Sequence, residues 1–295
     1  MAQRAFAGPH TVEKLDCLEK YLRAYCKVFK NQPRLRTIYI DAFAGTGEIP
    51  IAASYGELPL DTEGQAFITG STRRALELAD GFDEYIFIEK KRGNARALEN
   101  LRSEFPAKKI EIMNSDANSG LRALCAGRDW NRYRAVAFLD PFGSQVEWKT
   151  IEAIASTKAI DLWYLFPAGL SVHRQVRRKD GTVHEGHQEA LDRILGTQNW
   201  RSAFAEEFDS EPDLFEAGRK KSRKVVTPES ATRFMIKRMK DAFKGGVLEE
   251  WLPLGSGGHH MFSLLFAWAN PSPNARKAGD IAKAVMRGGR RGRTK

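Results

Sequence analysis

Short apolar runs alternate with helical patterns over the first half of the chain, and this alternation constrains the fold more than any other feature. Runs of strand length occur in "RTIYID", "EYIFIEK", "KIEIM", "YRAVAFLD" and "IDLWYLFP", and helical spacing follows each of the first four. Such repeats are typical of βαβ units, in which right-handed crossovers build a parallel sheet. The sequence therefore predicts an α/β fold with a mostly parallel central sheet up to residue 166.

The segments outside this alternation define the domain organisation that we expect. Apolar residues at helical spacing predict an amphipathic helix within an N-terminal segment, 1–32. The main domain, 33–270, contains a basic and helical insertion at about 167–245. It ends in two strand-like runs around "GSGG", which predict an antiparallel hairpin at the edge of the sheet. Residues 271–295 predict a final helix and a basic tail.

Composition narrows the cellular setting. The 295 residues are 42% hydrophobic, which is enough to bury a sizeable core. No run approaches the roughly 18 apolar residues that span a bilayer, and the first residues lack the apolar core of a signal peptide. The three cysteines, Cys17, Cys26 and Cys125, form no CxxC pair, which fits a reducing compartment. We expect a cytoplasmic protein without a membrane partner.

The net charge of +10 permits a polyanionic partner. The cationic residues gather in three clusters, Arg174–Asp180, Arg219–Lys224 and Arg287–Lys295. Each cluster taken alone is also compatible with a solvated loop or tail. Together they favour nucleic acid, bound through the basic loops and the tail.

Four of the predicted strands end in an acidic residue, at the edge where ligands of open α/β sheets bind. These residues are Asp41, Glu89, Asp116 and Asp140. A carboxylate is costly to desolvate without a partner, so four at neighbouring strand ends favour a ligand that brings hydrogen-bond donors. Each acid taken singly is also compatible with a helix N-cap or a turn.

The turn after the first strand, "DAFAGTG", contains Gly45 and Gly47, which allow the backbone to approach a ligand closely. It lacks the lysine of a GxxxxGK[ST] phosphate loop and the third glycine of the dinucleotide fingerprint, which disfavours a nucleotide hydrolase. Glu89, at the end of the next strand, is placed to accept both ribose hydroxyls of a nucleoside-bearing cofactor. Residues 49–69 predict an inserted loop, and whether it forms a lid stays open.

These motifs resemble a known family. The four strand-end acids, the glycine turn and the run "DPFG" are similar to motifs I to IV of class I S-adenosylmethionine-dependent methyltransferases. More closely, "YIDAFAGTG", "GSTRRAL", "FIEKKRGNARALENL", "LDPFGSQVEW" and "SLLFAWANP" resemble the three-Cys-motif partner proteins (TcmP), over roughly 11–271. The resemblance implies a Rossmann-like class I methyltransferase fold and S-adenosylmethionine as cofactor. It also implies a three-Cys-motif partner protein that resembles radical-SAM enzymes.

The run "DPFG" indicates the acceptor. Methyltransferases that act on exocyclic amines of bases carry Asp/Asn/Ser-Pro-Pro-Tyr/Phe at this strand end, where oxygen atoms accept from the NH₂ group and the aromatic ring stacks on the base. The motif "DPFG", which lacks the second proline, is similar to the motif of tRNA guanine-N2 dimethyltransferases. The predicted catalytic residues are therefore Asp140, Pro141, Phe142 and Gly143, with Asp140 orienting the acceptor nitrogen and Phe142 stacking on its ring.

The resemblance also implies the binding residues. Asp41, Gly45 and Gly47 are expected at the methionine moiety, Glu89 at the ribose and Asp116 at the adenine amine. The full set predicted for the cofactor is Asp41, Phe43, Ala44, Gly45, Thr46, Gly47, Glu89, Lys90, Asp116 and Ala117. The set predicted for the acceptor is Trp148, Arg174, Arg177 and Arg178. No metal is expected, because methyl transfer by in-line displacement needs mainly positioning.

Two functional hypotheses stay open from the sequence. The first is a methyltransferase that N-methylates a nucleobase exocyclic amine in a nucleic acid or nucleotide, working with the three-Cys-motif protein. The second is a non-catalytic protein that binds nucleic acid or docks that partner on a degenerate methyltransferase fold. The intact acids at positions 41, 89 and 140 argue against decay without proving turnover.

Overall fold

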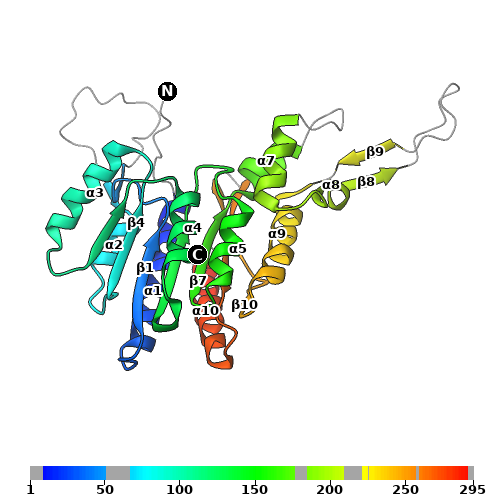
Figure 1. Cartoon of the computed structure of the whole chain (residues 1–295). Helices are drawn as coiled ribbons and strands as arrows, with labels where there is room; N and C mark the ends of the chain where they lie inside the picture. The colour runs from blue at the N-terminus through cyan, green and yellow to red at the C-terminus, as the bar shows by residue number, and fades with distance from the viewer. Residues whose placement is uncertain are drawn as a thin grey trace, which may run out of the picture.

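The computed structural model describes residues 9–50, 67–176, 185–208, 221–224, 226–256 and 259–291. A central eight-stranded sheet organises these ranges (Figure 1). Its strands are β1 (Arg36–Asp41), β4 (Glu84–Ile88), β5 (Ile110–Met113), β6 (Tyr133–Leu139), β7 (Ile160–Phe166), β10 (Gly246–Val247), β11 (Leu252–Ser256) and β12 (His259–Trp268). The order is β10-β12-β7-β6-β1-β4-β5, with β11 paired to β12.

The strand order confirms the predicted Rossmann-like class I methyltransferase fold. Strands β5, β4, β1, β6 and β7 are parallel, and their order along the chain is 3-2-1-4-5, as in doubly wound sheets. The antiparallel hairpin is also confirmed, because β11 and β12 pair with each other. Strand β12 lies inside the sheet rather than at its edge, since Leu264 pairs with Leu165 of β7 on one side and with Leu252 of β11 on the other.

Helices cover both faces of the sheet, which gives three layers (Figure 1). The main helices are α1 (Pro9–Phe29), α2 (Ser71–Leu76), α3 (Arg92–Glu104), α4 (Ala117–Gly127), α5 (Trp148–Ser156), α7 (Glu185–Leu195), α9 (Pro228–Ala242) and α10 (Arg276–Arg291). Successive strand residues point to opposite faces. Thus Ile38 and Ile40 join the core under α4, α5, α7 and α9, whereas Tyr39 joins the core under α1, α2, α3 and α10. None of the described helices has the length and apolar character needed to span a bilayer.

The insertion after β7 is only partly helical. Besides α7 and α9 it contains the π-helix η3 (Ala168–His173), α6 (Arg174–Val176) and α8 (Trp200–Ala203). It also contains a two-stranded sheet of β8 (Ala205–Phe208) and β9 (Lys221–Lys224), which the sequence analysis did not predict. This hairpin projects away from the central sheet (Figure 1). The sequence "KSRK" of β9 has no apolar alternation, so periodicity could not reveal it.

Smaller elements complete the described chain. Strands β2 (Glu48–Pro50) and β3 (Phe67–Thr69) pair at the base of the insertion that was predicted as a loop, and residues 51–66 lie outside the described residues. Two 3₁₀ turns, η2 (Trp130–Arg132) and η4 (Pro273–Ala275), precede β6 and α10. Helix α10 reaches residue 291, so the first part of the predicted basic tail is helical.

The three cysteines are unpaired thiols in structural positions. Cys17 and Cys26 are buried and Cys125 is partly buried. Burial raises the pKa of each thiol from 9.0 to about 12. Since the thiolate is the nucleophile, these side chains are poor candidates for covalent catalysis near neutral pH.

Candidate functional site

The four predicted acids lie in a row along the carboxyl edge of the parallel sheet. Asp116 follows β5, Glu89 follows β4, Asp41 ends β1 and Asp140 follows β6. These four strands are consecutive neighbours in the sheet, so each acid lies next to the acid of the adjacent strand. The structure therefore brings together the side chains that the sequence analysis predicted to share one site.

Glu89 holds the glycine turn after β1. One carboxylate oxygen accepts from the Gly45 backbone N–H at 3.0 Å, and the other accepts from the Lys91 N–H at 2.7 Å. Gly45 has φ +61°, and no atom lies within 4 Å of the position that a Cβ would take. Gly47, with φ +85°, has the Leu101 side chain 2.8 Å from that position. The backbone of Gly45 is thus open to a ligand, whereas Gly47 packs against the protein.

Asp41 supports this turn from inside the protein. Its carboxylate is fully buried and accepts from the Ser71 hydroxyl at 2.5 Å, the Phe43 N–H at 3.2 Å and the Tyr39 hydroxyl at 3.3 Å. Burial raises the pKa of Asp41 from 3.8 to about 6; the hydrogen bonds from Ser71 and Phe43 oppose this shift, and the nearby Asp140 adds to it. These three contacts of the Asp41 carboxylate are all internal, and its place at the methionine moiety stays a prediction.

Asp116 is half-exposed and caps the next helix. It accepts from the Asn118 N–H at 3.0 Å at the start of α4, and the ammonium of Lys90 lies 3.4 Å away. Burial opposes ionisation, but the Asn118 hydrogen bond and Lys90 together lower the pKa of Asp116 below 3.8. The side chains of Lys90 and Asp116 are 76% and 43% exposed, so both are accessible beside Glu89.

The loop that carries "DPFG" is anchored on α4. The Asn118 side chain accepts from the Glu147 N–H at 2.9 Å and donates to the Gln145 carbonyl at 2.8 Å. The Gln145 side chain in turn accepts from the Phe142 N–H at 3.0 Å. Gly143 has φ +79°, which turns the chain. The loop backbone is therefore fixed, while the Phe142 ring is 66% exposed and free to stack on a ligand.

Asp140 has a partner that the sequence analysis missed. Lys14 of α1 forms an ion pair with its carboxylate, and the two side chains are 9% and 24% exposed. The signal was present in the sequence, because Lys14 stands four, seven and eleven residues before Leu18, Tyr21 and Tyr25 on the apolar stripe of the helix. A lysine on the same face as these buried residues needs an anionic partner, which the strand-end acid Asp140 supplies.

Trp148 packs inside the protein, and its role in acceptor binding stays a prediction. Its side chain is 4% exposed, and its indole N–H donates to Glu152 at 2.7 Å. The Arg238 guanidinium of α9 lies 4.4 Å from the ring centroid. Gly196 packs so closely that a Cβ there would lie 2.1 Å from the ring. Trp148 therefore joins α5 to α9.

The remaining predicted residues divide by exposure. Among those assigned to the cofactor, Thr46 is exposed and Phe43 is partly buried, whereas Ala44 and Ala117 are buried. Pro141 is buried beside the exposed Phe142. Arg174 is the first residue of α6, and Arg177 and Arg178 lie outside the described residues.

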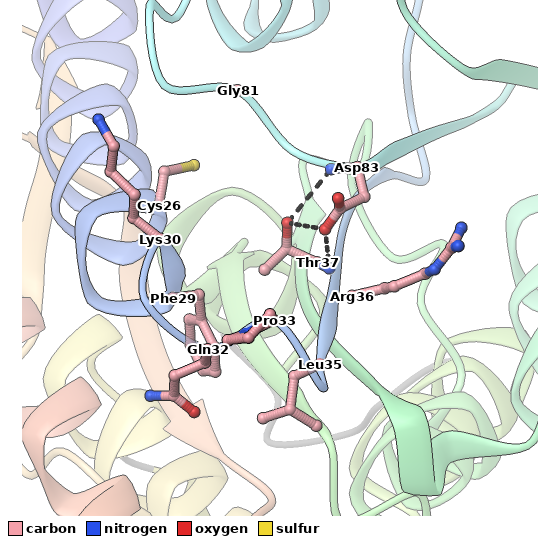
Figure 2. Close-up of a pocket in the computed structure, with 10 residues that line it drawn as sticks. All are labelled: Cys26, Phe29, Lys30, Gln32, Pro33, Leu35, Arg36, Thr37, Gly81 and Asp83. Carbon is pink, nitrogen blue, oxygen red and sulfur yellow. Dashed lines mark hydrogen bonds between the residues drawn. The ribbon is translucent and has the colours of Figure 1, made fainter.

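A polar pocket of about 430 Å³ lies at the opposite edge of the sheet (Figure 2). Its walls come from the end of α1, the start of β1 and the residues before β4. Asp83 there accepts from the Thr37 N–H at 2.6 Å and from the Thr37 hydroxyl at 2.9 Å. These groups satisfy one another, and none of the four strand-end acids lines the pocket. We therefore place the candidate site at the carboxyl edge.

Comparisons with known proteins agree with this fold. No family model and no curated protein matches the sequence. The structure is similar to that of protein LPL1258 from Legionella pneumophila, which is described by the family model DUF519. The TM-score is 0.50 and the sequence identity is 13%, and the match covers 97% of this chain and 93% of that chain. It is also similar to the SAH-bound N-terminal domain of EvdMO1 (TM-score 0.40, 10% identity, coverage 84% and 80%). A third similar structure is an S-adenosylmethionine-dependent methyltransferase from Clostridium acetobutylicum (TM-score 0.36, 8% identity, coverage 85% and 91%). The first similarity supports the fold, and TcmP membership stays a prediction.

Proposed function

We propose that this protein is an S-adenosylmethionine-dependent methyltransferase that N-methylates the exocyclic amine of a nucleobase in a nucleic acid or nucleotide. One observation carries the proposal. Asp116 and Glu89 are accessible groups that suit a nucleoside, and they lie in one row with the open backbone of Gly45. The same row continues to the loop of Asp140 and the exposed Phe142. This row matches a cofactor and an acceptor laid end to end along the edge of the sheet.

The residues present fit the cofactor. Each Glu89 oxygen accepts one backbone N–H, which leaves lone pairs for the two ribose hydroxyls. Asp116 is accessible for the adenine amine, and Gly45 has room for a ligand against its backbone. When bound, S-adenosylmethionine supplies a methyl group on a positively charged sulfur. Asp41 acts indirectly, by holding the turn in shape.

The loop after β6 provides the acceptor side. A carboxylate oxygen of Asp140 accepts a hydrogen bond from the acceptor NH₂ group, which fixes the nitrogen and stabilises the positive charge that develops on it. Phe142 stacks on the base, an interaction worth about 1–3 kcal/mol. The fixed backbone of this loop limits the freedom of the acceptor, so the chain contributes mainly positioning.

The basic clusters support a polyanionic acceptor. The hairpin that projects from the body (Figure 1) has "KSRK" as its second strand. The net charge of the chain is +10. Binding through such groups releases counterions, so the affinity should fall as salt rises. A salt-insensitive acceptor would instead indicate a small molecule. The three-Cys-motif partner rests on the family resemblance alone and is proposed on that basis.

Calorimetric titration of S-adenosylmethionine tests the proposal first. We expect the wild type to bind and a Glu89→Ala variant to lose most of the affinity, because the ribose loses its acceptors. Transfer of a tritiated methyl group to RNA, DNA and nucleotides then identifies the acceptor. Asp140→Ala should abolish transfer while it retains cofactor binding. Absence of cofactor binding by the wild type would contradict the proposal.

A second candidate is a non-catalytic nucleic-acid-binding or partner-docking protein. One observation favours it: Lys14 occupies the Asp140 carboxylate that an acceptor amine would need. Such a protein would bind RNA or DNA without consuming S-adenosylmethionine. The same tritium assay separates the two candidates, provided that nucleic-acid binding is measured in parallel by fluorescence anisotropy.

A further inference from the structure

Lys14 places a buried cation at the row of acids. Its side chain is only 9% exposed, and its ammonium pairs with Asp140. Within the part of the chain that the structure describes, no other side chain is recorded as an ion-pair or hydrogen-bond partner of this ammonium. An ammonium carries three N–H donors, so donors remain for a ligand.

The order of the acids locates Lys14 relative to the proposed cofactor. The adenine would lie at Asp116 after β5 and the ribose at Glu89 after β4. The next strands in the same direction are β1 and β6, so the methionine moiety would extend toward Asp41 and Asp140. Lys14 contacts Asp140 and therefore stands where this moiety ends.

The charges at this place need a cation. A methionine moiety carries an ammonium and a carboxylate, and its carboxylate would approach the acids Asp41 and Asp140. Like charges at a site with little solvent repel strongly, whereas a neighbouring ammonium offsets this repulsion. The Lys14 ammonium supplies a positive group at this place, which complements the carboxylate of the amino acid.

Helix α1 holds Lys14 in position. Farther along the helix, the Tyr21 hydroxyl donates to the buried Asp161 at 2.7 Å, and Arg74 of α2 pairs with Asp16 at 2.6 Å. The helix is thus fixed both to the sheet and to a neighbouring helix. Lys14 projects from a rigid element, as a binding residue should.

We propose that Lys14 is a further cofactor-binding residue, whose ammonium binds the carboxylate of the methionine moiety of S-adenosylmethionine. The inference rests on the proposed function, because it presupposes that cofactor. It makes α1 part of the binding site rather than an appendage to the domain.

Calorimetric titration with two ligands tests the inference. The ligands are S-adenosylmethionine and decarboxylated S-adenosylmethionine, which differ only in the carboxylate that Lys14 would bind. The variants are Lys14→Gln, which can still donate a hydrogen bond to Asp140, and Lys14→Arg, which keeps the charge. Lys20→Gln, an exposed lysine on the same helix, is the matched control. Far-ultraviolet circular dichroism checks that each variant is folded.

The expected result is a loss of affinity that depends on the carboxylate. Lys14→Gln should weaken S-adenosylmethionine about tenfold or more, since a charge-assisted hydrogen bond is lost. It should leave the decarboxylated ligand within about twofold of the wild type, and Lys14→Arg should restore part of the loss. Lys20→Gln should change neither affinity.

Other outcomes overturn the inference in distinguishable ways. An equal loss for both ligands would mean that Lys14 acts through Asp140 or through the fold, and no loss for either would mean that it does not bind the cofactor. In both cases binding by the wild type would keep the proposed function. Failure of the wild type to bind either ligand would overturn the proposed function together with this inference.

Discussion

The Glu89 carboxylate accepts a hydrogen bond from the Gly45 backbone N–H at 3.0 Å, which ties the end of β4 to the turn after β1. This contact gives one side chain two tasks. It holds the turn in the conformation that leaves the Gly45 backbone open, and it presents its remaining lone pairs beside that opening. The two glycines of the turn should therefore respond differently to substitution.

Gly45→Ala and Gly47→Ala are expected to separate binding from stability. Both residues have positive φ, so alanine strains either position by about 1–2 kcal/mol. The new methyl at position 45 enters the space proposed for the cofactor, which should weaken S-adenosylmethionine in calorimetric titration. The methyl at position 47 meets Leu101 at 2.8 Å and should add a further loss of stability in urea unfolding. An unchanged cofactor affinity in Gly45→Ala would place the ligand elsewhere.

Phe142→Ala is expected to weaken acceptor binding without destabilising the protein. The ring is 66% exposed, so its loss should change the free energy of unfolding by no more than about 0.5 kcal/mol. Loss of base stacking should weaken binding of a labelled oligonucleotide about tenfold in fluorescence anisotropy. Val28→Ala is the control, because Val28 is the other large apolar residue that is exposed among the described residues, at 40%. Equal affinity in both variants would exclude stacking by Phe142.

Trp148 and Gly196 are expected to be coupled through packing alone. Trp148→Ala should destabilise the protein by about 3–5 kcal/mol, because it opens a cavity between α5 and α9. Gly196→Ala should also destabilise it, since its Cβ would lie 2.1 Å from the indole and its φ is +65°. Gly196→Ala should lower the free energy of unfolding by less in the Trp148→Ala background than in the wild type. A double-mutant cycle of urea unfolding measures this difference. Strictly additive losses would argue against direct contact.

The sequence predicted what depends on local pattern. Apolar runs located the parallel strands, and the first acid after each run located Glu89, Asp116 and Asp140, because strand ends in a parallel sheet share one edge. The glycine turn was also located from the sequence, because Gly45 and Gly47 follow the first strand. These features need no knowledge of how distant segments pack.

The features that escaped prediction depend on tertiary contacts. Lys14 meets Asp140 across 126 residues of chain, and no local pattern states which anion a buried lysine will find. Trp148 directly follows the acceptor loop in sequence, yet its ring turns toward Gly196 and Arg238. Asp41 ends its strand as expected, but Ser71 from a later helix satisfies its carboxylate. In each case the direction of a side chain was decided by a residue far away in the sequence.

Asp161 links helix α1 to the sheet and should make the stability depend on pH. Its carboxylate is buried and accepts from the Tyr21 hydroxyl at 2.7 Å. Burial raises the pKa of Asp161 from 3.8 to about 7, although the bond from Tyr21 and the charge of Arg134 oppose the shift. The folded protein therefore binds this proton more tightly than the unfolded chain does. The contribution is fully present below the unfolded pKa and is lost as pH rises through about 7.

Asp161→Asn should remove this dependence, because the amide oxygen still accepts from Tyr21 but does not titrate. Urea unfolding at several values between pH 5 and pH 8 should show the variant gaining on the wild type as pH rises, by up to about 1.4 kcal/mol per pH unit. The pKa of Asp41 is also raised, but Asp41 is present in both proteins. Its contribution to the pH dependence therefore cancels when the free energies of unfolding of variant and wild type are subtracted. Asp80→Asn, at an exposed ion pair with Lys30, is the control and should show no such gain. A constant difference between variant and wild type across this range would show that Asp161 is ionised throughout.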